Sequence, residues 1–362
     1  MKEKVKELLI LILTAAFVLG FAVWRICKPD DAESLAERRK LTQAPALTAQ
    51  NVLSGRFMTD FESYSLDQFP LRDEFRTLKA LFATDVLHQS DNNGLYQERG
   101  SFSKLDYPLD KSSVENAAAR FQAVYDAYLG GNRVYLAVVP DKNYYTSADY
   151  PKMDYAALNA LLAEKMPYAQ PIDLTGTLRL ESYYRTDPHW KQEALLPAAR
   201  TILEAMGGAQ KDSYRTVRLD TPFYGSYAGQ SALPCSSDEL NYLTSDTLDA
   251  CRVYDYETDA EIGVYDLAAA QGRDGYELFL SGSKSLLTIE NPNARTQKEL
   301  VIFRDSYGSS IAPLLVEGYA KVTLVDIRYL APERLGRFVE FTDQDVLFLY
   351  SASVLNNSNA LR

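Results

Sequence analysis

Two short segments of this chain carry residues that could transfer a proton and attack a carbonyl carbon. Residues 183–190 read YYRTDPHW and contain one of only two histidines in the sequence. An imidazole moves protons near neutral pH, and a nearby carboxylate holds its tautomer and stabilises its cation. Residues 304–308 read RDSYG and place Ser306 directly after a short apolar run. We therefore predict that Asp187, His189 and Ser306 meet as a nucleophilic triad.

The positions of these residues suit such chemistry. A serine hydroxyl needs a base to remove its proton, and that base needs an orienting acid. At the start of a helix, Ser306 would have backbone N–H groups directed at a developing oxyanion. Asp187 and His189 can point into one cleft from an extended segment, which Pro188 stiffens. By spacing alone, a helix-capping serine and a chance Asp-x-His remain the alternatives.

The elements that must position these residues alternate between strand and helix. Apolar runs predict strands at 133–139, 171–174, 300–303, 322–325 and 346–350, with helices expected at 114–128, 155–165, 191–206, 309–316 and 333–340. This alternation predicts an α/β fold with a parallel sheet and right-handed crossovers. Ligands bind at the carboxyl edge of such sheets. Lys142, Arg328 and Tyr329 follow strands there, so each is a candidate substrate-binding residue, with a solvated surface residue as the alternative.

The N-terminus indicates a membrane helix. Lys2, Lys4 and Lys6 precede an uncharged run from residue 8 to residue 24, and Arg25 closes it. That run would span ~25 Å as a helix. We predict an uncleaved anchor at 1–27, with a signal peptide as the alternative. The lysines favour a cytoplasmic N-terminus. The rest of the chain would then be extracytoplasmic and would consist of a linker (28–49) and one domain (50–362) that contains a β-rich insertion or lid (212–293).

Composition excludes several other functions. A formal charge of −11 without a basic face argues against nucleic acid. Phosphate-binding loops, zinc-ligand spacings and dinucleotide glycine patterns do not occur, so we expect no cofactor and no metal. His88 lacks an acidic or cysteine partner at ligand spacing and is interpreted as a structural or surface residue. Cys235 and Cys251 are a candidate disulfide in an extracytoplasmic domain, with two thiols as the alternative.

Several segments together resemble one protein family. These segments are 67–73 (DQFPLRD), 139–142 (VPDK), 183–190 (YYRTDPHW), 223–226 (FYGS), 304–307 (RDSY) and 325–329 (VDIRY). In this order they resemble the DHHW-motif family of exported bacterial proteins. The first histidine of the DHHW signature is Pro188 in this chain.

The resemblance implies a fold and an activity. The DHHW family is similar to the alginate O-acetyltransferases, which have a permuted SGNH-hydrolase fold with an Asp-x-His-Trp segment early and an Asp-Ser segment late. Their triad corresponds to Asp187, His189 and Ser306. The SGNH glycine and asparagine of the oxyanion hole are harder to place, and residues 281–283 (SGS) and 225–226 (GS) are the candidates.

Two functions remain open from the sequence. The first is a bacterial, single-pass membrane-anchored O-acyltransferase or esterase that acts on a cell-surface or exported polysaccharide. Related systems imply a multipass membrane acyltransferase as its partner. The second is a non-catalytic polysaccharide-binding or assembly protein that kept the fold.

Overall fold

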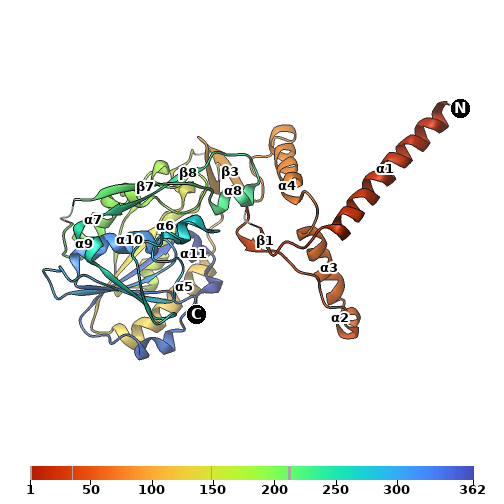
Figure 1. Cartoon of the computed structure of the whole chain (residues 1–362). Coiled ribbons are helices and arrows are strands. Elements are labelled where there is room, and N and C mark those ends of the chain that lie inside the picture. The colour runs from red at the N-terminus through yellow and green to blue at the C-terminus, as the bar shows by residue number, and fades with distance from the viewer. Residues whose placement is uncertain (1, 35, 148, 211–212) are drawn as a thin grey trace. The chain divides into compact units, whose positions relative to one another are not determined.

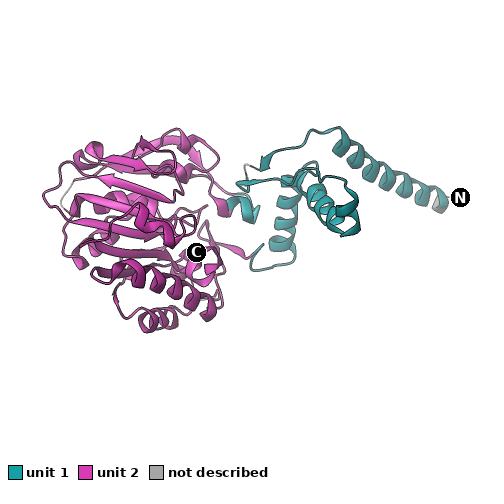
Figure 2. Cartoon of the chain, turned by 90° about the horizontal axis from the view of Figure 1, so that it is seen from below, with its two compact units in different colours: residues 1–93, 228–234 teal, residues 94–227, 235–362 magenta. Residues whose placement is uncertain are grey.

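The chain folds as two compact units. The structure, a computed structural model, describes every residue except 1, 35, 148 and 211–212. Unit 1 comprises residues 1–93 and 228–234, and unit 2 comprises residues 94–227 and 235–362 (Figure 2). The sequence placed the start of the globular domain at residue 50, whereas the compact sheet-containing unit begins at residue 94.

Unit 1 is built mainly from helices. Its elements are α1 (Lys2–Cys27), β1 (Glu33–Ser34), β2 (Arg39–Lys40), α2 (Ala49–Leu53), α3 (Arg56–Asp67), α4 (Arg72–Leu81) and a π-helical turn (Phe82–Val86). In α1, residues 4–27 are long and apolar enough to cross a membrane, with a mean hydropathy of 2.3 over an 18-residue stretch. Residues 28–49, expected to be a tether, contain β1 and β2, which pair antiparallel.

Unit 2 is organised around a mostly parallel sheet. Its strand order is β10-β9-β11-β13-β12-β14-β5-β6. The strands from β13 to β6 run parallel, and β11, β9 and β10 extend the sheet antiparallel. The bounds are β5 (Arg133–Val139), β6 (Ala169–Ile172), β9 (Arg252–Asp255), β10 (Ala260–Ile262), β11 (Leu286–Glu290), β12 (Glu299–Arg304), β13 (Lys321–Val325) and β14 (Asp345–Ser351).

Helices cover both faces of this sheet (Figure 1). Leu300 and Ile302 of β12 contribute to a core with α7 (Leu196–Ala205) and α10 (Gly308–Leu315). The alternate residues Val301 and Phe303 contribute to a second core with α5 (Lys111–Val124), α6 (Tyr155–Lys165) and α11 (Ala352–Asn356). Successive side chains of a strand point to opposite faces, so one apolar run fills both cores.

The predicted α/β fold is confirmed, with local differences. The helix expected over 191–206 is shorter, because residues 192–194 form a 3-10 turn before α7. Residues 333–340 do not form the expected α-helix, and a 3-10 helix covers Pro332–Arg337 instead. The smaller remaining elements are β3 (Leu95–Glu98), β4 (Ser101–Lys104), β7 (Arg215–Phe223), α8 (Ser226–Ser231), β8 (Asp238–Thr244) and α9 (Asp246–Ala250). The chain passes from unit 2 to unit 1 within α8.

The segment expected to be a β-rich insertion has two parts. β7 and β8 form a separate antiparallel ribbon. β9, β10 and β11 instead complete the central sheet, since β11 pairs with β13. Residue 212, where the expected segment begins, lies outside the described residues. The segment is β-rich, as expected, but only the ribbon stands apart from the sheet.

The expected disulfide is wrong for this structure. Cys235 and Cys251 carry separate thiols. Cys235 precedes β8, and Cys251 follows α9 beyond the other end of that strand. A seven-residue strand extends over roughly 20 Å, which is far more than the Cα separation of about 4.4–6.8 Å that a disulfide spans.

Candidate active site

The structure brings together the three residues predicted to form a triad. The Nδ1 of His189 lies 2.5 Å from Oδ1 of Asp187, and its Nε2 lies 2.8 Å from Oγ of Ser306. An ionised carboxylate accepts hydrogen bonds, so Nδ1 carries the proton and Nε2 is left to accept from the serine hydroxyl. The Asp187 side chain is 1% exposed and the His189 side chain 13%. The orienting acid is therefore shielded, while the base reaches the surface.

A tight loop holds Asp187 and His189 at its tip. Tyr183 and Trp190 form a β-bridge across it, and the N–H of Tyr184 donates to the carbonyl of His189 at 3.0 Å. The N–H of His189 donates to Oδ1 of Asp187 at 3.1 Å. The Asp-x-His spacing thus works because the chain reverses here.

Backbone N–H groups of a second segment fix the other carboxylate oxygen. The N–H of Ser226 donates to Oδ2 of Asp187 at 2.8 Å, and that of Gly225 donates to Oγ1 of Thr186. A Cβ at position 225 would lie 2.2 Å from Cβ of Asp187, so only glycine permits this approach. The interpretation of 225–226 as an oxyanion hole is therefore wrong, because both N–H groups hold the acid loop.

Lys142 also holds this loop from behind. Its side chain is fully buried, and its ammonium donates to the carbonyl oxygens of Tyr184, Arg185 and Asp187 at 2.7–3.2 Å. Burial lowers its pKa to about 8, although Asp141 and Asp187 oppose the shift. The expectation that Lys142 faces substrate is wrong, since three carbonyl oxygens take up the ammonium.

Asp238 is a further support that the sequence did not reveal. This buried residue at the start of β8 accepts hydrogen bonds from the N–H of Arg185 and from both the N–H and the hydroxyl of Thr186, at 2.6–2.9 Å. Thr186 in turn accepts from Gly225. The acid loop is therefore fixed by side chains on both sides.

Ser306 lies in the turn between β12 and α10, at the carboxyl edge of the sheet. Asp305 braces this turn, because its carboxylate accepts from the N–H of Tyr307 at 3.0 Å and from that of Ser351 at 2.8 Å. The Tyr307 hydroxyl donates to the carbonyl of Pro188, which ties the serine turn to the acid loop. A Cβ on Gly308 would lie 2.7 Å from Cβ of the buried Arg304.

Tyr276 stacks on the imidazole of His189. Its ring centroid lies 3.8 Å from that of His189, with the planes 8° apart. The Tyr276 hydroxyl lies 2.8 Å from Oγ of Ser310, which also accepts from the indole N–H of Trp190 at 2.9 Å. A buried ring with a tethered hydroxyl restricts rotation of the imidazole. The sequence contains 25 tyrosines, and no motif singled out this one.

The remaining predicted residues lie at the same edge. Arg328 and Tyr329 follow β13, which neighbours β12. The Arg328 guanidinium pairs with Asp326 through Nε and Nη2, whereas Tyr329 is 51% exposed. Their contact with substrate stays a prediction. His88, interpreted as a structural or surface residue, is exposed after the π-helical turn that follows α4.

The other segment considered for the oxyanion hole, residues 281–283, already uses some of its donors in hydrogen bonds within the fold. In segment 281–283, the N–H of Gly282 donates to the carbonyl of Phe279, and the Ser281 hydroxyl donates to Asp266. Ser283 is exposed. The N–H of Ser306 itself has no acceptor within the described part of the chain, so it is the donor nearest to the nucleophile.

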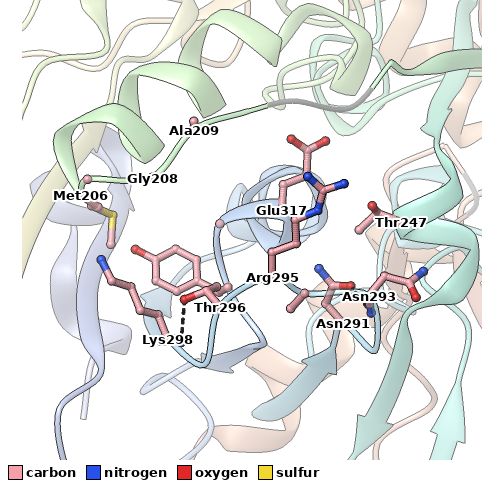
Figure 3. A pocket seen from close by; sticks show the side chains of 14 residues that line it. Met206, Gly208, Ala209, Thr247, Asn291, Asn293, Arg295, Thr296, Lys298 and Glu317 are labelled. Carbon is pink, nitrogen blue, oxygen red and sulfur yellow. Dashed lines mark hydrogen bonds between the residues drawn. The ribbon is translucent and has the colours of Figure 1, made fainter.

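Among the described residues, no group of three His, Cys, Asp or Glu side chains could hold a metal ion. A cavity of about 590 Å³ lies at the opposite edge of the sheet, between the end of α7 and the segments that precede β12 and β13 (Figure 3). It is lined by Asn291, Asn293, Arg295, Lys298 and neighbouring residues.

Comparison with solved structures identifies the fold. No protein-family model matches the chain, and no curated protein matches it in sequence. A DHHW family protein from Eubacterium siraeum superposes with a TM-score of 0.61 at 21% identity, over 75% of this chain and 97% of that one. The chain has the fold of this DHHW protein.

Further solved structures are similar to this DHHW-like chain. PatB1 of Bacillus cereus, solved with a sulfonyl adduct, has a TM-score of 0.58 at 16% identity, over 72% of this chain and 95% of PatB1. The O-acetyltransferase domain of Pseudomonas putida AlgJ has a TM-score of 0.46 at 13% identity, over 73% of this chain and 92% of that chain. The predicted resemblance to an SGNH-like fold is confirmed.

Proposed function

We propose that the chain is a serine-dependent O-acyltransferase or esterase that acts on a cell-surface or exported polysaccharide. One observation carries this proposal: His189 bridges Asp187 and Ser306 with hydrogen bonds of 2.5 and 2.8 Å. That arrangement defines a base, its orienting acid and its nucleophile. The DHHW-like fold supports the same reaction class.

In the proposed reaction, His189 carries the transferred proton in each step. As Oγ of Ser306 bonds to the acyl carbon, Nε2 of His189 takes the hydroxyl proton. The backbone N–H of Ser306 would donate to the resulting oxyanion. The carbon–leaving group bond then breaks, and His189 returns the proton to the leaving oxygen. In the second half-reaction, His189 deprotonates a sugar hydroxyl or water, whose oxygen attacks the acyl carbon. The bond between that carbon and Oγ of Ser306 breaks, and His189 returns the proton to Oγ.

We further propose that α1 is a retained, single-pass anchor and that unit 2 is extracytoplasmic in a bacterial cell. The lysines in the first turns of α1, Lys2, Lys4 and Lys6, favour this orientation. An anchored domain would stay beside a multipass membrane acyltransferase that supplies the acyl group, as the family resemblance implies. Exposed Tyr329 and neighbouring Arg328 at the catalytic edge are proposed to contact the sugar.

Hydrolysis of p-nitrophenyl acetate by the purified full chain tests the proposal. We expect Ser306→Ala to reduce turnover by at least about 10³-fold. Ser213→Ala is the matched control, because Ser213 is exposed and precedes β7 at the end remote from Gly225. Turnover that is absent in the folded wild type, or equal in both variants, would instead favour a non-catalytic polysaccharide-binding protein.

A further inference from the structure

Unit 1 exposes large apolar side chains that a water-soluble unit would bury in a core. The outer apolar face, defined here as Leu71, Phe75, Leu78, Phe82 and Val86, follows one side of α4 and the π-helical turn after it. Its side chains are 38–62% exposed. Their helical spacing is that of a core-facing stripe, yet they stay exposed in the described part of unit 1, where Phe75 also contacts Phe21.

Ion pairs fix which side of α4 points outward. Arg72 and Arg76 both pair with Glu37, with nitrogen–oxygen distances of 2.6 and 3.2 Å. Lys79 donates to Asn92 at 2.9 Å. These three cations hold the polar side of α4 against the rest of unit 1. Its apolar side is consequently directed away from the unit.

The interior of unit 1 is correspondingly polar or small. Asp67 is 9% exposed and accepts from Arg39 and Thr42. Gln68 is fully buried and donates to the carbonyls of Asp31 and Thr42. Large apolar side chains lie outside instead, including Met58 and Leu66 of α3, at 67% and 64% exposed. Burying polar groups that are internally paired and exposing apolar ones suits contact with lipid.

Contacts between aromatic rings fix the position of the outer apolar face along the length of α1. The Phe21 ring lies 5.4 Å from that of Phe69 and 5.7 Å from that of Phe75. Phe21 precedes Arg25 by four residues, so these rings lie roughly 6 Å along α1 from its charged exit. Trp24, the residue type typical of membrane interfaces, stacks on Phe21. That depth matches the 5–10 Å to which interfacial helices bury their apolar face.

We propose that the outer apolar face lies in the headgroup–acyl boundary of the bilayer that α1 crosses. The occupant is lipid, because the face continues from a membrane-length helix at the depth of its interfacial aromatic rings. This inference rests on the proposed anchor and is independent of the chemistry of Ser306. It makes unit 1 a membrane-surface platform that holds α1 and α4 together at one depth.

Spin-label accessibility of the full chain tests this assignment. The chain is reconstituted alone into vesicles of phosphatidylethanolamine and phosphatidylglycerol, with Cys27, Cys235 and Cys251 replaced by serine. Nitroxides are attached at Leu78→Cys or Phe82→Cys, and at Asp73→Cys as the matched control, because Asp73 is a polar residue of the same helix whose side chain is 54% exposed. We expect the first two labels to collide more with oxygen than with an aqueous nickel complex, and the Asp73→Cys label to show the reverse.

Two results would overturn the assignment. Equal access of nickel to all three labels would place the face in water. Shielding of Leu78→Cys and Phe82→Cys from both oxygen and nickel would indicate a second copy of this chain. A label at Leu13→Cys, within α1, reports separately whether α1 enters the bilayer, so failure of the anchor is distinguished from failure of the interfacial face.

Discussion

The two units of this chain arrange polar and apolar residues in opposite ways. Unit 2 buries its large apolar side chains on both faces of a sheet and gathers buried polar groups at the carboxyl edge. Unit 1 buries Asp67 and Gln68 and exposes a row of leucine and phenylalanine side chains. This difference supports the proposal that lipid contacts one face of unit 1.

The polar groups of the two units also differ in purpose. In unit 1, ion pairs such as that between partly exposed Arg39 and Asp67 join segments to one another. The Arg39 hydrogen bond lowers the pKa of Asp67, although burial opposes the shift. In unit 2, buried Lys142 and Asp238 instead fix one catalytic loop. Variants in each unit should therefore have separable effects.

The largest effect is expected from the acid of the triad. Asp187→Asn keeps the size of the side chain but favours the wrong tautomer of His189, and it should lower kcat by about 10⁴-fold. Steady-state hydrolysis of p-nitrophenyl acetate measures this. Asp173→Asn is the control, since Asp173 lies in the loop after edge strand β6 and bonds only locally to Thr175 among its described partners. Equal losses in both variants would contradict the assignment.

Lys142→Met should have the next largest effect. Three carbonyl oxygens would lose their donor, and the loop that carries Asp187 and His189 would loosen. A displacement of about 1 Å at such a site lowers turnover on the order of 10²-fold. Lys142 touches no substrate in this assignment, so kcat should fall while KM stays nearly constant. A rise in KM alone would instead restore Lys142 as a substrate-binding residue.

The same lysine predicts a pH dependence of stability. Burial holds its pKa at about 8 in the folded chain, below the value of 10.5 expected when unfolded. Between these values the unfolded chain binds more protons, so this residue makes the free energy of unfolding rise with pH. Lys142→Met should lack that rise between pH 8 and 10.5, as measured by denaturant unfolding. Parallel curves for wild type and variant would contradict the buried ammonium.

A smaller effect is expected at the stacked ring. Tyr276→Leu removes the aromatic surface against His189 and should lower kcat about tenfold. Tyr276→Phe keeps the stack but loses the hydroxyl contact with Ser310, so it should retain most of the activity. If Phe and Leu impair turnover equally, the hydroxyl and not the stack would be the important part.

Substitutions on the outer apolar face of unit 1 should leave the rate of ester hydrolysis nearly unchanged. Leu78→Asp combined with Phe82→Asp alters only exposed positions, so hydrolysis of a water-soluble ester by the detergent-solubilised chain should change by less than about twofold. A large loss of this activity, with unit 2 still folded, would break the separation between the two units.

The sequence predicted the sheet and the triad because both depend on local signals. Alternating apolar runs marked β5, β12 and β13, and an isolated Asp-Pro-His segment marked the acid and base. The approach of Gly225 to Asp187 left a weak signal, a glycine within the resembling segment 223–226. Its role as a close-contact residue, and not an oxyanion donor, required coordinates.

Other features left no usable signal. Lys142 follows a strand as solvated and substrate-facing lysines also do, and only the fold brings three carbonyl oxygens around it. Tyr276 is one tyrosine among many. The spacing of Leu71, Phe75 and Leu78 is that of a helical stripe, which a core and a membrane favour equally. Its outward direction follows from the pairing of Arg72 and Arg76 with Glu37.

Covalent capture of the nucleophile tests the central claim most directly. The full chain is treated with a sulfonyl fluoride at pH 7.5, digested, and mapped by mass spectrometry, with Asp187→Asn as the comparison. We predict one sulfonyl group per chain on Ser306, and much slower labelling of the variant, whose His189 cannot activate the hydroxyl. Labelling elsewhere, or none in the folded wild type, would contradict the assignment of Ser306 as a nucleophile.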